Sequence, residues 1–304
     1  MIAAHLQPES LPEPEPGRSL WQDARRRIRQ NPVAMASFSI LVLVGIFALF
    51  GPIFSNWSSE DINWNVLGNV ETAGRPALDS GHYFGTDQLG RDLFVRTAHG
   101  VRVSMMVGII GALIAIVVGT LYGTIAGYVG GRTDNIMMRT VDVIMSIPYM
   151  FLLIILLVMF GQSILLLFVG IGLVSWLDMA RIVRGQTLSI KNREFVESAV
   201  VIGVPPAFII LRHILPNLVG VVIVYATLLI PNMIIFESFI SFLGLGIQEP
   251  NTSLGVLISE GASQMQYGVL WQLGFPLFFF ILIQFGFFFL GDGIRDALDP
   301  KDRH

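Results

Sequence analysis

The chain has 304 residues, of which 53% are hydrophobic and only 13% are charged, and its formal net charge is −3. A soluble domain usually carries about 25% charged residues, and a soluble protein this apolar would have too little polar surface to cover its exterior. The composition therefore indicates an integral membrane protein. The small negative charge gives no indication of a nucleic-acid partner. The absence of cysteine excludes disulfides and thiolate metal sites, and no metal site of another kind is predicted.

The N-terminal segment 1–31 differs in composition from the rest of the chain. Residues 1–17 are polar and rich in proline, which predicts a disordered tail. Ser19 can cap a helix over 20–30 that carries four arginines, and the pair Asn31-Pro32 ends it. This basic, amphipathic helix is expected to lie on the cytoplasmic surface of the membrane, and residues 32–304 are expected to form the transmembrane domain.

Hydropathy predicts an all-α membrane domain with six transmembrane helices. A span needs roughly 20 apolar residues. The uncharged stretch 143–177 is too long for one crossing, at about 1.5 Å per residue, and the break Gly161-Gln162-Ser163 divides it. The expected spans are near 33–54, 103–129, 137–160, 164–184, 218–245 and 271–291.

The distribution of basic residues predicts the orientation of these spans. With the N-terminus inside, 15 of the 19 lysine and arginine residues lie in cytoplasmic segments and 4 in outer segments. The positive-inside rule therefore places both termini in the cytoplasm. Segment 55–101 is then an extracytoplasmic loop, and 185–217 is a cytoplasmic loop.

Lysine occurs only at Lys191 and Lys301. Neither belongs to a G-x-x-x-x-G-K-[ST] phosphate-binding loop. If ATP drives this protein, another chain must bind the nucleotide.

The cytoplasmic loop 185–217 contains a patterned segment. Residues 191–201 are expected to form a short amphipathic helix with Phe195, Ala199 and Ile202 on one face. Gly203 can end this helix in a left-handed conformation, and a second helix over 207–214 should end at Pro216. The residues alone leave two interpretations, a lever for a partner protein and an ordinary connector.

A resemblance to a known family bears on this choice. Glu197-Ser198-Ala199, Gly203 and Leu215-Pro216 resemble the E-A-A…G…I-x-L-P loop of ABC importer permeases. Ser198 stands in place of the second alanine, and His213 in place of the isoleucine. The resemblance implies that this loop is a coupling helix that docks into a groove of an ATPase subunit.

Three other segments are similar to the dipeptide and oligopeptide permeases of that family. They are 82–92, with its F-G-T-D-x-x-G-R-D signature, 237–246 and 291–300. In the first, Gly85 and Gly90 permit tight turns, Asp87 can cap a helix, and Arg91 can bridge carboxylates. The combination most resembles the C-type permease subunit of oligopeptide importers.

The resemblance implies a type I ABC importer permease fold and a non-catalytic role. The chain would form half of the translocation pore of an ATP-driven, binding-protein-dependent oligopeptide importer in the bacterial inner membrane. The implied partners are a second, B-type permease subunit, two ATP-binding subunits that hold ATP and Mg, and an extracytoplasmic peptide-binding protein. This chain itself binds no cofactor. A dipeptide, nickel or other small-solute permease of the same family is the alternative.

Charged residues inside the spans are candidates for function. Asp178 and Arg181 can pair on one helix face. Glu237 is a candidate for the translocation path, with a structural role as the alternative. The spans otherwise contain few ionisable residues, which argues against an ion-coupled secondary transporter, and the scattered histidines argue against a membrane-embedded enzyme.

Overall fold

The computed structural model describes residues 20–298, and within this range the chain is helical and forms no β-strand. The expected disordered tail and its Ser19 cap lie outside the described residues. The elements in chain order are α1 (Leu20–Gln30), α2 (Pro32–Phe50), η1 (Gly51–Phe54), α3 (Val70–Ala73), α4 (Leu93–Val129), α5 (Gly131–Met145), α6 (Tyr149–Phe160), α7 (Ile164–Lys191), α8 (Glu194–Val201), α9 (Pro206–Ile209), η2 (Ile210–Ile214), α10 (Leu215–Phe242), α11 (Leu254–Gln264), η3 (Met265–Tyr267) and α12 (Trp271–Leu298).

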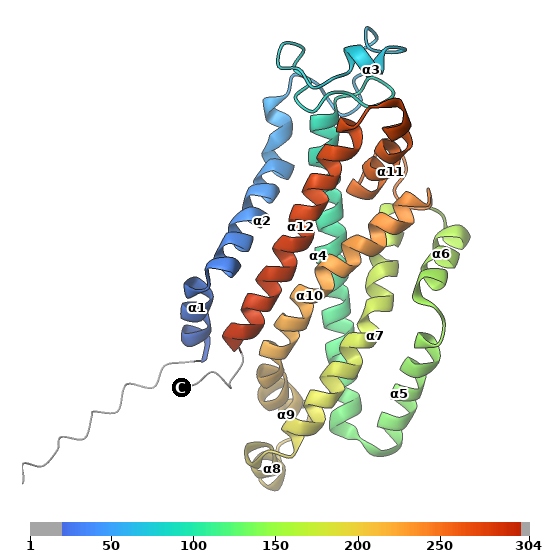
Figure 1. Ribbon diagram of the computed structural model, residues 1–304. Coiled ribbons are helices and arrows are strands. Elements are labelled where there is room, and N and C mark those ends of the chain that lie inside the picture. Colours follow the sequence, from blue (N-terminus) through green and yellow to red (C-terminus); the bar gives the residue numbers. More distant parts are fainter. Residues whose placement is uncertain (1–19, 299–304) are drawn as a thin grey trace, which may run out of the picture.

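The long helices form an elongated bundle around α4. This helix packs against α7, α10 and α2, while α12 packs against α2, α10 and α11. Figure 1 shows the irregular segment around α3 at the upper end of the bundle, and α8 and α9 at the lower end. The helices α5 and α6 run along one side, and α1 lies beside the lower end of α12.

Five described helices are long and apolar enough to cross a membrane, and the count is six if α5 and α6 together form one span. These two helices are bent by 77° relative to each other. The break lies at 146–148, where Pro148 precedes α6 and the residue before a proline disfavours helical geometry. The expected third span, 137–160, therefore contains a sharp bend, whereas Pro231 and Pro276 lie within continuous helices.

Helix α4 begins at Leu93, ahead of the expected start of the second span at residue 103. The Asp92 carboxylate caps it by accepting a hydrogen bond from the Val95 N–H. Arg96 and Arg102 lie in the first three turns of α4, and both guanidinium groups have partners in the structure. Arg102 donates to the carbonyl of Ala48 at 2.8 Å, and Arg96 is paired with carboxylates. The position of the membrane boundary along α4 stays a prediction.

Small residues bring α4 and α7 into close contact. Gly119, Gly123 and Gly127 recur every four residues on the face of α4 that meets α7. A Cβ atom at Gly127 would lie 2.8 Å from the Cβ of Thr187, and one at Gly123 would overlap the carbonyl of Ala180. The glycines therefore allow the two backbones to approach closely.

Candidate functional site

The 185–217 loop contains a short helix, a glycine turn and a second helical segment. Helix α8 follows Arg193, which occupies its N-cap position. At its end the Val204 N–H donates to Ala199 O and the Gly203 N–H donates to Val200 O, both at 3.0 Å. This is the hydrogen-bond pattern of a Schellman cap, and Gly203 has the positive φ it requires, 84°.

The buried face of α8 differs from the expected one. The prediction placed Phe195, Ala199 and Ile202 together, but Phe195 is 39% and Ile202 is 81% exposed. Val196 and Ala199 are the buried pair, in a cluster with the ends of α7 and α10. The prediction was wrong because α8 packs against the ends of α7 and α10 with the face that carries residues 196 and 199, and helical spacing alone does not select that face.

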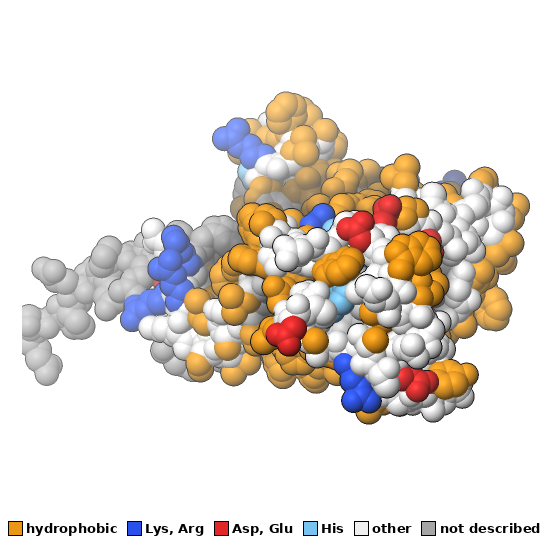
Figure 2. All heavy atoms as spheres, turned by 90° about the horizontal axis from the view of Figure 1, so that it is seen from above, with side chains coloured by type: hydrophobic (Ala, Val, Ile, Leu, Met, Phe, Trp, Pro, Cys, Tyr) orange, Lys and Arg blue, Asp and Glu red, His pale blue; other side chains and the backbone are white. Residues whose placement is uncertain are grey.

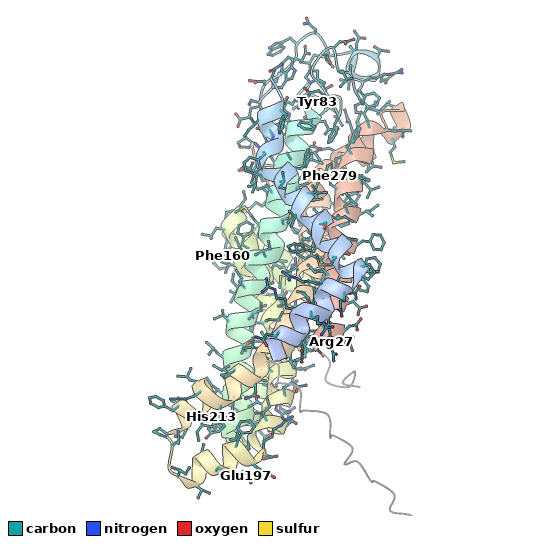
Figure 3. All side chains as sticks on the ribbon, turned by 90° about the vertical axis from the view of Figure 1, so that its left-hand side faces the viewer. Arg27, Tyr83, Phe160, Glu197, His213 and Phe279 are labelled. Carbon is teal, nitrogen blue, oxygen red and sulfur yellow. The ribbon has the colours of Figure 1, made fainter. Side chains whose placement is uncertain are left out.

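The opposite side of this loop exposes apolar side chains at the end of the molecule. We call this surface the apolar tip, and it consists of Val200, Val201, Ile202, Phe208 and Leu211, all more than half exposed. The motif residues Glu197 and Ser198 are exposed beside it. Figure 3 shows Glu197 at the lower end of the molecule, with His213 on the neighbouring segment.

The exposed surface of the apolar tip was not among the features predicted from the sequence. The run Val200-Val201-Ile202 carries no helical periodicity that distinguishes an exposed surface from core. A signal was nevertheless present, because three consecutive apolar residues at the end of an eight-residue helix cannot all face the bundle. Such a cluster of exposed apolar side chains is typical of a surface that binds another protein.

The second helical segment does not end at Pro216, as the sequence indicated. Helix α9 continues through the π-helical segment η2 into α10, and Pro216 lies in the first turn of α10. The π-helical turn of η2 is wider than an α-helical turn, so the Leu215 N–H donates to the carbonyl five residues earlier, Ile210 O. Proline is tolerated there because its missing N–H falls at such an irregularity. Leu215 packs against the buried cluster of the loop.

Ion pairs hold the helices next to the loop. Arg184 on α7 donates to both carboxylate oxygens of Asp134 on α5, at 2.8 and 2.5 Å. Arg181 bonds Asp142 on α5 at 2.5 Å. The expected partner of Arg181, Asp178 on the same helix, was therefore wrong, because α5 brings a carboxylate closer. These contacts fix α7, which leads directly into the loop.

Glu237 is fully buried, at 0% exposure, among serine side chains. Its carboxylate accepts hydrogen bonds from Ser241 at 2.7 Å, from Ser104 on α4 at 3.1 Å and from Ser238 at 3.4 Å. The Leu254 N–H, at the start of α11, donates to the Ser104 hydroxyl at 3.1 Å. This network joins α4, α10 and α11. A buried carboxylate needs such donors, and the nearby N-terminus of α11 also favours negative charge.

A second charged cluster lies at the opposite end of the bundle. Asp87 accepts from Arg91 and from Arg96, both at 2.6 Å. Arg91 also pairs with Glu249 at 2.8 Å, and the buried Arg96 with Glu260 of α11 at 3.2 Å. Burial raises the pKa of the Glu260 carboxyl, and the charge of Arg96 opposes that shift. The prediction that Arg91 bridges carboxylates is confirmed, and the cluster ties the 55–92 segment to α11.

The start of α4 is held by a buried histidine. His82 Nδ1 lies 2.8 Å from Asp92 Oδ1, His82 Nε2 lies 3.1 Å from the amide nitrogen of Asn63, and the ring of Trp57 stacks on the imidazole. Burial raises the pKa of the Asp92 carboxyl, while the hydrogen bond from His82 lowers it. Asp92 is the helix cap, whereas the expected cap, Asp87, accepts from the backbone N–H groups of Leu89 and Arg91.

The expected tight turns in this segment are confirmed, since Gly85 and Gly90 both have positive φ, 78° and 73°. Figure 2, which looks onto this end of the molecule, shows acidic side chains at several points among hydrophobic ones. Among residues 20–298, no group of three or more His, Asp or Glu side chains is arranged to hold a metal ion. The ion pairs of Asp87 and Arg96 link the irregular segment before α4 to α4 and α11.

Two family models match the chain. Residues 119–304 match the binding-protein-dependent transport system inner membrane component. Residues 19–69 match the N-terminal transmembrane domain of oligopeptide transport permease C. The first match includes Gly119, Gly123 and Gly127 of α4, the 185–217 loop and Glu237.

Curated relatives match along nearly the whole chain. The oligopeptide transport system permease protein OppC of Escherichia coli K12 is 56% identical over 287 residues, which cover 94% of this chain and 93% of the relative. The dipeptide transport system permease protein DppC of Bacillus subtilis is 44% identical, with coverage of 95% and 88%.

A solved structure of the MetNI methionine ABC transporter in an inward-facing conformation has a chain with a similar fold. The TM-score is 0.53 at 19% identity, and the match covers 68% of this chain and 96% of that one. At this identity the likeness shows the fold alone, that of a type I ABC importer permease. The family match over 119–304, the identity to the permeases and this fold likeness agree with one another. This chain is a multi-pass membrane protein that belongs to the binding-protein-dependent transport system inner membrane component family, as an ABC importer permease of the dipeptide and oligopeptide group.

Proposed function

We propose that this chain is a permease subunit of an ATP-driven, binding-protein-dependent oligopeptide importer and forms half of its translocation pore. The observation that carries the proposal is the 56% identity to an oligopeptide permease over 94% of the chain. A permease subunit is non-catalytic, in keeping with a sequence that contains no phosphate-binding loop. ATP and Mg are then bound by two partner ATPase subunits, and this chain binds no cofactor.

The proposed assembly contains a second, B-type permease subunit, the two ATP-binding subunits and an extracytoplasmic peptide-binding protein. Both termini and the 185–217 loop are proposed to lie in the cytoplasm, and the membrane is the bacterial inner membrane. The basic residues concentrated in these segments support this orientation. Consistent with it, the described ends of α1 and α12 lie at the lower end of the bundle, where α8 and α9 also lie (Figure 1).

The coupling site is proposed to be the loop that carries Glu197, Ser198, Ala199, Gly203, Leu215 and Pro216. Two features support a lever there. Val196 and Ala199 anchor α8 to the ends of α7 and α10, so a force on the loop can reach the bundle. The apolar tip is exposed, and exposed apolar side chains of this kind are typical of a surface that binds another protein. Ala199 would therefore act from inside the loop, while Glu197 and Ser198 would face the partner.

Glu237 is proposed to reach the translocation path only when α11 moves. In the described conformation its carboxylate is enclosed by serines of α4 and α10, next to the first turn of α11. A shift of α11 would remove the Leu254–Ser104 hydrogen bond and uncover this side of the carboxylate. Until then the residue holds three helices together.

Transport by the assembled complex tests the proposal. The chain is reconstituted in vesicles with its partner subunits and binding protein, and uptake of a labelled oligopeptide is measured with and without ATP. We expect ATP-dependent uptake that unlabelled oligopeptide competes for. The 44% identity to a dipeptide permease favours dipeptides as the second candidate, and competition by dipeptide but not by oligopeptide would select it. Competition by nickel alone would contradict a peptide role.

A further inference from the structure

A groove of about 440 Å³ lies on the outside of the bundle, at the end that carries the 185–217 loop. Helices α1, α2, α10 and α12 form its walls. Figure 1 shows α1 beside the lower ends of α2 and α12, and Figure 3 marks the same helix with Arg27. The lining residues are Ala24, Arg25, Ile28, Arg29, Met35, Phe38, Ile223, Leu290, Ile294 and Leu298.

The walls of the groove are apolar except at one rim. Leu290, Ile294 and Leu298 follow each other at four-residue spacing on α12 and form one continuous ridge. Met35 and Phe38 of α2 face this ridge. Since these helices are expected to cross or border the membrane, the groove opens toward lipid, and its volume of about 440 Å³ is within the range of small-molecule sites.

Two arginines form the polar rim. Arg25 and Arg29 are one turn apart on α1, so both guanidinium groups lie on one side of the helix. Both side chains are exposed. No carboxylate of residues 20–298 lies within ion-pairing distance of either one. The groove therefore carries two positive charges that nothing in the described chain neutralises.

The position of these arginines is fixed by the packing of α1. Ala24 is 4% exposed and contacts the groove, which places α1 against the bundle. At the end of the helix the Asn31 side chain accepts from the Val33 and Ala34 N–H groups and starts α2. Helix α2 thus begins directly after α1 ends, and Arg25 and Arg29 line the same groove as the apolar residues.

We infer that this groove binds one anionic phospholipid, with an acyl chain between α2 and α12 and its phosphate between Arg25 and Arg29. Guanidinium groups match phosphate oxygens with paired hydrogen bonds, and basic pockets beside membrane helices suit anionic headgroups. A zwitterionic lipid fits less well because its own ammonium group competes for the phosphate and repels the arginines. The site is independent of the solute that the transporter carries.

Lipid retention by the complete transporter tests the inference. The complex is purified in detergent, incubated with vesicles made of equal parts phosphatidylglycerol and phosphatidylethanolamine, and the retained lipid is identified by native mass spectrometry. Each arginine near an anionic headgroup gives about a five-fold preference. We therefore expect the double variant Arg25→Gln, Arg29→Gln to lower the preference for phosphatidylglycerol roughly 25-fold.

Two further variants separate the site from the general charge of α1. Arg26→Gln removes the same charge from the same helix but lies outside the groove, and it should keep the parent preference within about two-fold, which corresponds to a difference under about 0.5 kcal/mol. Ile294→Trp fills the groove without changing charge and should reduce retention of both lipids. Addition of inorganic phosphate should not displace the lipid, because phosphate lacks an acyl chain.

Several results would overturn the inference. They are parent-like retention in the double arginine variant, an equal loss in Arg26→Gln, equal retention of the zwitterionic lipid, and displacement by phosphate alone. Cross-linking of residue 294 to a partner permease in the parent complex would also overturn it, since a protein would then occupy the groove.

Discussion

The substitution Gly203→Val tests whether the left-handed backbone conformation of the turn after α8 is needed for binding of the ATP-binding subunits. Gly203 has a φ of 84°, and a Cβ atom added there would have no neighbour within 4 Å. The change therefore introduces strain without a steric clash. The left-handed conformation costs a residue with a side chain about 1–2 kcal/mol, which lowers the population of the observed loop about 5- to 30-fold. We expect the affinity for the ATP-binding subunits to fall by a similar factor.

Two variants control for effects other than the turn. Asparagine tolerates the left-handed conformation better than other residues, so Gly203→Asn should lose less affinity than Gly203→Val. Gly185→Val places the same side chain in α7, where it also meets no atom within 4 Å and φ is not positive. The measurement is the Kd of the ATP-binding subunits for each permease variant in detergent, alongside its yield. A parent-like Kd for Gly203→Val would refute the requirement for this turn.

Gly123→Leu should lower the yield and Tm of the purified complex, because overpacking against α7 costs about 1–3 kcal/mol or more, whereas Gly45→Leu, with no neighbour within 4 Å, should not. His82→Ala should raise the pKa of Asp92 further, since burial already raises it and the His82 hydrogen bond opposes this. A carboxyl whose pKa is raised by folding stabilises the fold below its unfolded pKa and loses that contribution as pH rises through the folded value. The Tm deficit of this variant relative to the parent should therefore grow with pH, and a deficit that shrinks would contradict it. A reporter active only outside the cytoplasm should function when fused near Asp79 and fail near Lys191.

The sequence predicts the helical membrane domain well because span formation depends on local composition. Twenty apolar residues in lipid must satisfy their backbone groups internally, so hydropathy alone identifies the long helices. The four-residue spacing of Gly119, Gly123 and Gly127 likewise indicates a close helix contact. Their partner, α7, could not be predicted, because four-residue spacing gives the face of one helix but not the helix it meets.

Residues whose role depends on a distant partner were harder to predict. Arg181 pairs with Asp142 instead of Asp178 because α5 folds back beside α7. The buried face of α8 depends on how the loop packs against the ends of α7 and α10, which its eight residues do not encode. Glu237 was identified as unusual from its position in a span, but the serines that surround it come from three different segments of the chain.

Site-specific cross-linking tests most directly whether the 185–217 loop is the contact between this permease and its ATPase partners. The chain contains no cysteine, so each introduced cysteine is unique. Val201→Cys lies on the apolar tip, and Leu78→Cys lies at the opposite end of the bundle, with parent side chains 86% and 82% exposed. In the assembled complex, we expect a short thiol-reactive cross-linker to join residue 201, and not residue 78, to an ATP-binding subunit. A cross-link from residue 78 to that subunit, or none from residue 201, would contradict it.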